Sequence, residues 1–378
     1  MMPIKVEAAV KVRLSKCSIG NEEVNATSKV LKSEYLGMGS VVLEFENAIQ
    51  HYLETPMSVV CVNTATSALQ LSIAALDIGY GDEVLVPSLT YVASFQAISA
   101  TGATPVACEI DRDTFFLNVD DARNKITEKT KAIMPVHYAS SSSNMRAVYD
   151  LAQEFNLRVV EDAAQAFGSK RDNMKIGMDG DIICFSFDGI KNITCGEGAA
   201  ILTKDKRVLQ RLQDDRLLGV QKDSDNRYVG KRSWDFDVVN QGFRFHMSNI
   251  NAAIGLAQLQ KVDDFKLKRQ EIARRYIDSL SSLTQVSVLN LDYNQIMPHI
   301  FVIKVDRRDA LREYLTNSGI ECGLHYKPNH LLTKYHAKSA LPETESCYSK
   351  TITLPCHVDL TIPEQNYVIR HIKDFFSA

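Results

Sequence analysis

Residues 185–198 read FSFDGIKNITCGEG, and this stretch decides how the whole chain is interpreted. It continues the apolar run at 182–185, which is typical of a buried strand, and Asp188 and Gly189 are turn residues at the end of that strand. We therefore expect Lys191 at the mouth of a sheet, in partly apolar surroundings. Such surroundings disfavour the ammonium form and leave a nucleophilic amine that can form a Schiff base.

A carboxylate occupies the corresponding place on a second strand. The run LRVVED (157–162) puts Asp162 at the carboxyl end of another apolar strand. A lysine and an aspartate on neighbouring strand ends are what pyridoxal 5'-phosphate (PLP) requires. The lysine binds the cofactor aldehyde, and the carboxylate keeps the pyridine nitrogen protonated so that the ring can draw off electrons. Lys191 and Asp162 therefore predict a PLP site.

From about residue 60 to 205, short apolar runs alternate with helical patterns. This alternation predicts an α/β fold with a mostly parallel central sheet flanked by helices, and ligands that bind beyond the strand carboxyl ends. Asp162 and Lys191 both fall at such ends. The runs are VLVP (84–87), TPVACEI (104–110), AIMPV (132–136), LRVVED (157–162), IICFSF (182–187) and AAILT (199–203).

The rest of the chain suggests a second, smaller domain. Residues 218–240 are polar and irregular and predict a long loop, a feature that is usually functional or mobile. A long helix, with room for a break, is expected from near Ser248 to about Leu283. Short strands and helices follow it. We therefore predict a large PLP-binding α/β domain at 1–247 and a smaller C-terminal α+β domain at 248–378.

Composition excludes several classes of function. The chain has 378 residues and a formal net charge of −3, which argues against nonspecific binding to nucleic acid or anionic membranes. The eight cysteines form no CxxC pair, the nine histidines show no metal-ligand spacing, and no apolar run is long enough for a membrane span. No GxSxG, P-loop or GxGxxG motif occurs. We expect a cytoplasmic enzyme with reduced thiols and no metal.

Further residues are candidates for cofactor contacts. VNTATSAL (62–69) passes from a strand into a helix, where backbone amides and the Thr66 hydroxyl can hold a phosphate, although such residues also cap most helices. Ser186 is equally a phosphate contact or an ordinary strand serine. Tyr91 follows a strand end, where it can stack on a planar ring or belong to the core. Gln165 lies one helical turn after Asp162 and can reach a ring substituent.

Together these stretches resemble the sugar aminotransferases of the DegT/DnrJ/EryC1/StrS family over nearly the whole chain. The resemblance implies a fold-type-I PLP enzyme that forms a homodimer with active sites shared across the interface. The stretches that carry it are LSKCSIGNEE (14–23), EYLGMGSVVLEFE (34–46), VNTATSAL, VPSLTYVAS (86–94), VVEDAAQAFG (159–168), FSFDGIKNITCGEG, NQGFRFHMSNINAAIGLAQL (240–259), GIECGLHYKPNH (319–330) and LPCHVDLT (354–361).

The resemblance also implies roles for individual residues. Lys191 is the cofactor-bound lysine and the proton shuttle, and its presence favours amination over the dehydration of family members that have a histidine there. The other implied contacts are Asp162 with the pyridine nitrogen, Gln165 near the ring hydroxyl, Tyr91 stacked on the ring, and Ala65, Thr66 and Ser186 on the phosphate.

The sequence departs from the family pattern in two of the motifs that resemble cofactor-binding segments. The usual SGT is Thr64-Ala65-Thr66, and a positive φ at the alanine would be costly. The usual GYNYRMS is GFRFHMS (242–248), so Arg244 stands where an asparagine often reaches the neighbouring subunit's phosphate. We interpret Arg244 as a contact to the cofactor phosphate, with the nucleotide as the alternative.

The resemblance implies L-glutamate as amino donor, pyridoxamine 5'-phosphate as the intermediate cofactor form and a nucleotide-linked keto sugar as acceptor. KNITCGEG is closer to members that aminate C4 than to those that aminate C3. We therefore expect an NDP-4-keto-6-deoxyhexose to give an NDP-4-amino-4,6-dideoxyhexose for surface polysaccharide, of the O-antigen or lipopolysaccharide type. The alternatives are C3 amination and, remotely, a non-catalytic PLP-binding sensor. His325, Tyr326 and His330 are candidate sugar contacts, with a structural turn as an equal rival.

Overall fold

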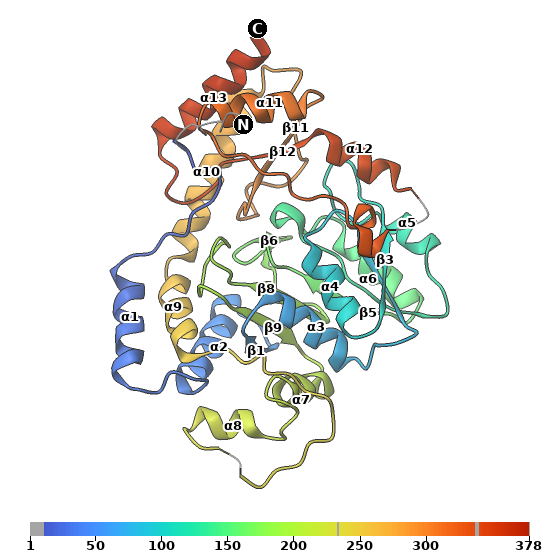
Figure 1. Ribbon diagram of the computed structural model, residues 1–378, viewed down its shortest axis with the longest axis vertical. Helices are drawn as coiled ribbons and strands as arrows, with labels where there is room; N and C mark the ends of the chain where they lie inside the picture. Colours follow the sequence, from blue (N-terminus) through green and yellow to red (C-terminus); the bar gives the residue numbers. More distant parts are fainter. Residues whose placement is uncertain (1–10, 233, 337–339, 378) are drawn as a thin grey trace, which may run out of the picture.

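The computed structural model describes residues 11–232, 234–336 and 340–377, and its larger part is built on a seven-stranded sheet (Figure 1). Neighbouring strands from β8 to β3 pair in parallel, whereas β9 runs antiparallel to both β1 and β8. Each of the six predicted apolar runs forms a strand, so the prediction of a mostly parallel sheet is confirmed. In spatial order the strands are β1 (Ser58–Val62), β9 (Ala199–Thr203), β8 (Ile182–Ser186), β5 (Arg158–Asp162), β4 (Thr130–Ile133), β2 (Glu83–Pro87) and β3 (Thr104–Cys108).

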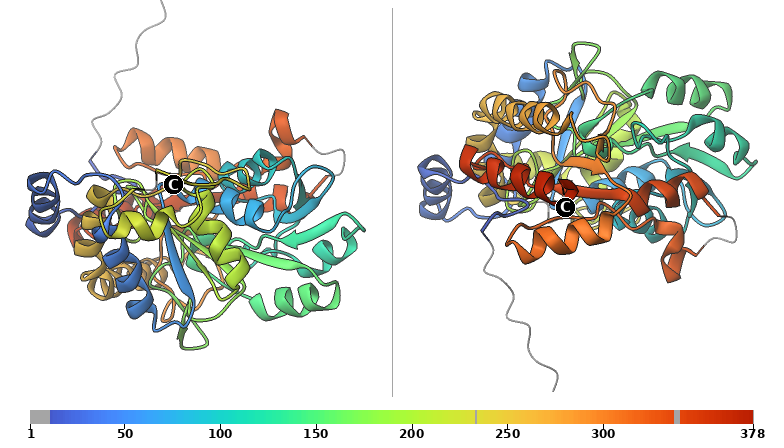
Figure 2. Two further views of the ribbon diagram at one scale, coloured as in Figure 1. Left: turned by 90° about the horizontal axis from the view of Figure 1, so that it is seen from below. Right: turned by 90° about the horizontal axis from the view of Figure 1, so that it is seen from above.

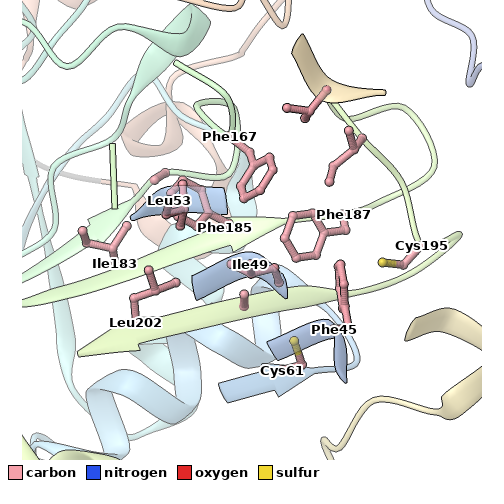
Figure 3. Close-up of a cluster of buried hydrophobic side chains, with 14 of the residues drawn as sticks. Phe45, Ile49, Leu53, Cys61, Phe167, Ile183, Phe185, Phe187, Cys195 and Leu202 are labelled. Carbon is pink, nitrogen blue, oxygen red and sulfur yellow. The ribbon is translucent and has the colours of Figure 1, made fainter. Parts of the chain in front are cut away.

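Helices cover both faces of this sheet because both faces of its strands are apolar. Cys184 of β8 points into the cluster that contains residues of α3 (Ala65–Ala75), α4 (Val92–Ala100) and α7 (Lys206–Asp215). Phe185 points the other way, into a cluster with α2 (Ser40–Leu53), which Figure 3 shows together with Phe187 and Cys195. Nearer β3, the second face is covered by α5 (Val119–Asn124) and α6 (Met145–Glu154).

A second sheet lies in the C-terminal part of the chain. It contains the antiparallel strands β10 (Ser287–Val288), β11 (Phe301–Lys304) and β12 (Thr351–Leu354). The helices α10 (Val262–Leu280), α11 (Arg308–Asn317) and α13 (Ile362–Ser377) contribute to the same apolar cluster. Figure 1 shows these elements at one end of the molecule.

The predicted long helix is present and is broken into α9 (Asn249–Leu259) and α10. Helix α9 packs against α1 (Asn21–Lys32) and α2, and Ala252 belongs to the core of the large sheet. The second apolar core begins only at Ile272, within α10, and it also includes Val12 from the N-terminal segment. The predicted boundary at residue 248 thus precedes a helix that packs on the large sheet.

Several short elements complete the described chain. The predicted loop at 218–240 contains one helix, α8 (Asp223–Tyr228), and is otherwise irregular over its described residues. The remaining elements are η1 (Tyr138–Ser140), β6 (Lys170–Arg171), β7 (Met174–Lys175), α8 (Asp223–Tyr228), η2 (Asn329–Leu331), η3 (Thr333–Tyr335) and α12 (Pro342–Lys350). Among all described helices, none has the length and apolar character needed to cross a bilayer.

Candidate active site

The loop that carries Lys191 is fastened at both ends to the core. Phe187 donates its N–H to the Gly198 carbonyl at 2.8 Å, and Cys195 donates to the Phe187 carbonyl at 2.8 Å. The side chains of Phe187 and Cys195 are both buried in the cluster drawn in Figure 3. Within the loop, the Lys191 N–H bonds the Asp188 carbonyl at 3.1 Å. The loop therefore projects from the carboxyl end of β8 as a rigid support for the lysine.

The Lys191 amine is free to react. Its side chain is half-buried, and it makes no hydrogen bond or ion pair with any residue in the described part of the chain. Burial lowers the pKa of Lys191, although Asp188 and Asp162 act in the opposite direction. A lowered pKa increases the fraction of neutral amine, which is the nucleophilic and basic form.

Asp162 lies at the end of β5 with its carboxylate held from two sides. The residue is 6% exposed, the Ser94 Oγ donates to Oδ2 at 2.7 Å, and the Ala164 N–H donates to Oδ1 at 3.2 Å. Hydrogen bonds to an ionised carboxylate stabilise its charge and fix its direction. Ser94 was not anticipated from the sequence. The only signal for it was its position in VPSLTYVAS, within the first turn of the helix that follows β2.

The N-terminus of α3 offers backbone amides beside this face of the sheet. The Thr64 side chain caps the helix by accepting from the Ser67 N–H at 3.1 Å, so the amides of Ala65 and Thr66 remain without intrahelical partners. Ala65 is helical and is not among the residues with positive φ, so the cost expected at this position does not arise. Ser186 lies two residues after Cys184 on β8, so its side chain points to the same face of the sheet, the face that α3 covers.

Two further predicted residues, Tyr91 and Gln165, lie beside a third, Tyr326. The Tyr91 side chain is 59% exposed, and its ring centroid lies 5.5 Å from that of Tyr326. Gln165 Nε2 donates to the Tyr326 hydroxyl at 3.1 Å, while Gln165 Oε1 accepts from the Ala139 N–H at 2.7 Å. Gln165 is also 6% exposed. The structure thus joins Tyr91, Gln165 and Tyr326 in one group.

The two predicted histidines differ in availability. His325 Nδ1 bonds the Thr353 hydroxyl at 2.8 Å, and no described residue bonds its Nε2. Burial and the charge of Lys191 lower the pKa of His325 to about 4, which places it close to the lysine as a neutral ring. His330 is buried, with Nδ1 at 2.7 Å from the Ser88 hydroxyl and Nε2 at 3.2 Å from Glu345. Both nitrogens of His330 are therefore used within the fold.

Arg244 lies apart from the residues described so far. Its side chain is exposed, and no described contact joins it to Lys191, Asp162 or α3. The backbone of Arg244 pairs with that of Leu217, and the carbonyl of Phe245 accepts a hydrogen bond from the Asn63 N–H at 2.6 Å. The segment that carries Arg244 thus runs beside the N-terminus of α3, while the guanidinium remains on the surface of this chain.

Two residues near Lys191 were not anticipated from the sequence. Asn192 Nδ2 donates to the carbonyls of Phe167 at 2.8 Å and Met297 at 3.1 Å, which ties the lysine loop to the segment before β11. That segment includes His299, which is 5% exposed. No local pattern marks either residue, because their partners are remote in the sequence.

These residues fit PLP. A half-buried amine without a partner can take the aldehyde, a fixed carboxylate can face the pyridine nitrogen, and free helix amides with small neighbouring side chains can hold the phosphate. Lys191, Asp162 and the first turn of α3 all lie at the carboxyl-end edge of the sheet, where ligands bind in open α/β folds.

Comparison with known proteins gives a consistent result. Residues 17–373 match the DegT/DnrJ/EryC1/StrS aminotransferase family. The uncharacterized protein MJ1066 of Methanocaldococcus jannaschii is 33% identical over 371 residues, covering 95% of this chain and 96% of that protein. DesV of S. venezuelae is 32% identical, with a TM-score of 0.87 and 95% of each chain covered. The PLP form of Spr1654 from Streptococcus pneumoniae is 29% identical, with a TM-score of 0.87, covering 96% of this chain and 98% of that one.

Proposed function

The chain belongs to the DegT/DnrJ/EryC1/StrS aminotransferase family, and on this basis we propose that it moves an amino group from L-glutamate to C4 of an NDP-4-keto-6-deoxyhexose. The enzyme is a PLP-dependent sugar aminotransferase. The product is then an NDP-4-amino-4,6-dideoxyhexose, which we assign to surface polysaccharide of the O-antigen type. We propose that the reaction takes place in the cytoplasm.

The observation that carries this proposal is the free Lys191 amine at the sheet edge that also presents Asp162. Burial lowers the pKa of the Lys191 amine, and Ser94 orients the Asp162 carboxylate at 2.7 Å. A lysine in such surroundings serves as nucleophile and as base, whereas an exposed lysine would be protonated. A non-catalytic sensor would have no use for a desolvated, unpaired lysine at this place.

When bound, PLP supplies an electrophilic aldehyde and a ring that withdraws electrons. We assign Asp162 to the pyridine nitrogen, the amides of Ala65 and Thr66 and the Ser186 hydroxyl to the phosphate, and Tyr91 to the face of the ring. Gln165 lies beside them, where its amide is already oriented by Ala139.

Lys191 performs the proton transfers. In the first half-reaction its Nζ takes the proton from Cα of the amino donor. In the second half-reaction the same Nζ gives a proton to the sugar carbon that acquires the amine. The neutral ring of His325, held through Nδ1 by Thr353, is the histidine that we assign to the sugar, together with Tyr326. His330 supports this segment from behind through Ser88 and Glu345.

The choice of C4 rests on the motif KNITCGEG at 191–198, which is closer to C4-aminating members than to C3-aminating ones. Amination at C3 is the alternative. The position of the new amine in the isolated product, read by NMR coupling along the sugar ring, distinguishes the two.

We also propose a homodimer with shared active sites. Support comes from apolar side chains that this chain leaves exposed on α1, where Val24 is 60% exposed, and on the irregular segment after α8, where Trp234 is 87% and Phe236 54% exposed. Helix α1 lies at the outer edge of the molecule in both views of Figure 2. In this arrangement the exposed Arg244 is available to the partner's cofactor phosphate. Sedimentation at several protein concentrations measures the assembly state.

The visible absorption spectrum of the PLP-loaded enzyme tests the proposal. We expect a band from the lysine-bound cofactor that bleaches with L-glutamate and returns with one NDP-4-keto-6-deoxyhexose. Lys191→Ala should fold and bind PLP noncovalently, yet show neither the band nor turnover. A Lys191→Ala enzyme with full activity would exclude Lys191 as the reacting amine. A wild-type band that ignores glutamate would point to another donor.

A further inference from the structure

His299 is a buried histidine with unused hydrogen-bonding capacity. The residue is 5% exposed, and its Nδ1 is buried without a partner. Across residues 11–232, 234–336 and 340–377, no side chain or backbone group bonds its Nε2 either. A buried polar group without a partner costs free energy, so an unbonded imidazole beside a binding site is a candidate for a contact to a ligand.

The backbone of His299 is fixed on both sides. Its N–H donates to the Ser140 Oγ at 3.0 Å, and its carbonyl accepts from Arg269 Nη1 at 3.1 Å. Ser140 itself has a left-handed backbone with φ of 72°, which costs energy in a residue other than glycine. Its hydroxyl also reaches the carbonyl of Met297 at 2.6 Å. The fold therefore positions this imidazole firmly while leaving the ring itself unbonded.

The ring lies near the catalytic lysine. Met297, two residues earlier, is bonded to Asn192, the neighbour of Lys191, at 3.1 Å. Burial, followed by the charges of Lys191, Arg269 and His325, lowers the pKa of His299 well below its usual value. His299 is therefore a neutral imidazole that can donate one N–H.

The surroundings of His299 are positive and lack an anion. Arg269 is 2% exposed, its Nε has no partner, and its Nη1 donates only to backbone carbonyls, at 2.8–3.1 Å. Among the described residues, no carboxylate forms an ion pair with Arg269, and none is a cause of the shift in the pKa of His299. Buried cations are usually paired with an anion. The region around His299 and Arg269 is thus positively charged and can accommodate an anion that the described residues do not supply.

The chemistry of the two substrates identifies that group. In the amino donor, the α-carboxylate is attached to the carbon whose proton Lys191 removes. In an NDP-4-keto sugar, the diphosphate is attached to C1, across the ring from the reacting carbon. An anion site beside Lys191 therefore suits the donor. We propose that His299 donates a hydrogen bond to the α-carboxylate of the amino donor, with the buried Arg269 behind it, an inference that rests on the proposed function.

Donor binding tests this assignment in three variants of the PLP-loaded enzyme. His299→Leu removes both ring nitrogens, and His299→Asn retains an N–H donor on its side-chain amide. His357→Leu is the matched control, because His357 is also buried beside Arg269 with an unpartnered Nδ1, but Lys191 is not among the charges that act on it. The readouts are the Kd of the unreactive dicarboxylate glutarate by calorimetry and the KM of L-glutamate. Thermal unfolding and the visible cofactor band verify that each variant is intact.

We expect His299→Leu to raise the Kd of glutarate and the KM of glutamate by about 10- to 100-fold, the effect of one hydrogen bond to a charged group. His299→Asn should lose less, and His357→Leu should bind glutarate as the wild type does. An intact His299→Leu enzyme with wild-type affinity for glutarate would overturn the proposal. The proposal would also be overturned if His299→Leu weakened the binding of the nucleotide sugar but not that of glutarate, because the ring would then belong to the acceptor site. Failure of the proposed function would appear in the wild type instead, as a cofactor band that glutamate does not bleach.

Discussion

Replacing Arg216 should destabilise the enzyme more than any exposed ion pair can. Arg216 is fully buried, and its Nη1 donates to Glu46 Oε1 at 2.7 Å and to the Cys61 carbonyl at 2.8 Å. Its Nη2 contacts the hydroxyls of Tyr228 and of Ser224. Although burial alone would lower it, Glu46 and Tyr228 raise the pKa of Arg216, so the guanidinium stays charged.

Arg216→Met keeps the volume and removes the charge, which leaves the Glu46 carboxylate buried without its cation. Such a loss costs about 3–5 kcal/mol. For a chain of 378 residues the unfolding entropy is about 0.8 kcal/mol per kelvin, so the unfolding midpoint should fall by roughly 5 °C. Scanning calorimetry on the PLP-loaded enzyme, at one protein and cofactor concentration, measures this shift.

The double variant Arg216→Met with Glu46→Met decides whether the reasoning is right. It removes the stranded carboxylate together with the cation, so we expect it to regain most of the lost stability. Lys204→Met is the surface control, because the ion pair of Lys204 with Asp179 at 2.7 Å is exposed and should contribute less than about 1 kcal/mol. If the single and double variants were equally destabilised, the buried carboxylate would not be the source of the effect.

Three further predictions address the site. Ala65→Gly should not improve PLP affinity and should lower stability by about 0.5–1 kcal/mol, because Ala65 is helical and gains nothing from glycine; a cofactor titration and a melting curve measure both effects. Ser140→Ala loses the hydrogen bonds to Gln165 and His299 and should cost about 1–3 kcal/mol in urea unfolding, whereas Ser140→Gly should lose about 1 kcal/mol less because it relieves the positive φ; equal losses would contradict this explanation. The pKa of His325 is about 4 in the folded protein and about 6.5 in the unfolded chain. The neutral ring of His325 therefore contributes its full share of stability above pH 6.5, and about 3 kcal/mol of stability is lost as the pH falls to 4. His325→Gln should flatten that part of the curve of unfolding free energy against pH, and an unchanged slope would refute the assignment.

Local sequence was sufficient for the strands of the large sheet and for the long helix that forms α9 and α10, and it placed Lys191 and Asp162 at strand ends. Apolar runs bounded by turn residues specify buried strands because such runs can be satisfied only inside a sheet. Once the βα alternation implies a parallel sheet, the carboxyl ends of its strands must meet at one edge. The strand pattern alone therefore places Lys191 and Asp162 together, and the family match supports the cofactor that they predict.

Some local features were ambiguous in the sequence alone. The positive φ considered at Ala65 depended on a comparison of motifs, while the observed helix begins at that residue and needs no left-handed backbone. Helix α9 packs against α1 and α2, and α8, within the irregular segment, packs against α2; both are contacts between remote parts of the chain.

What only the tertiary structure decided are contacts between residues far apart in the chain. Ser94 meets Asp162 across 68 positions, His330 is saturated by Ser88 and Glu345, and His299 is brought to Lys191 through Asn192 and Met297. Periodicity reports which face of a helix or strand is buried, but it carries no information on which distant polar group will lie opposite. The sequence by itself thus determined which residues stand at the edge of the sheet, and the fold decided which of them remain free to bind a ligand, because hydrogen-bond partners are assigned only when remote segments pack together.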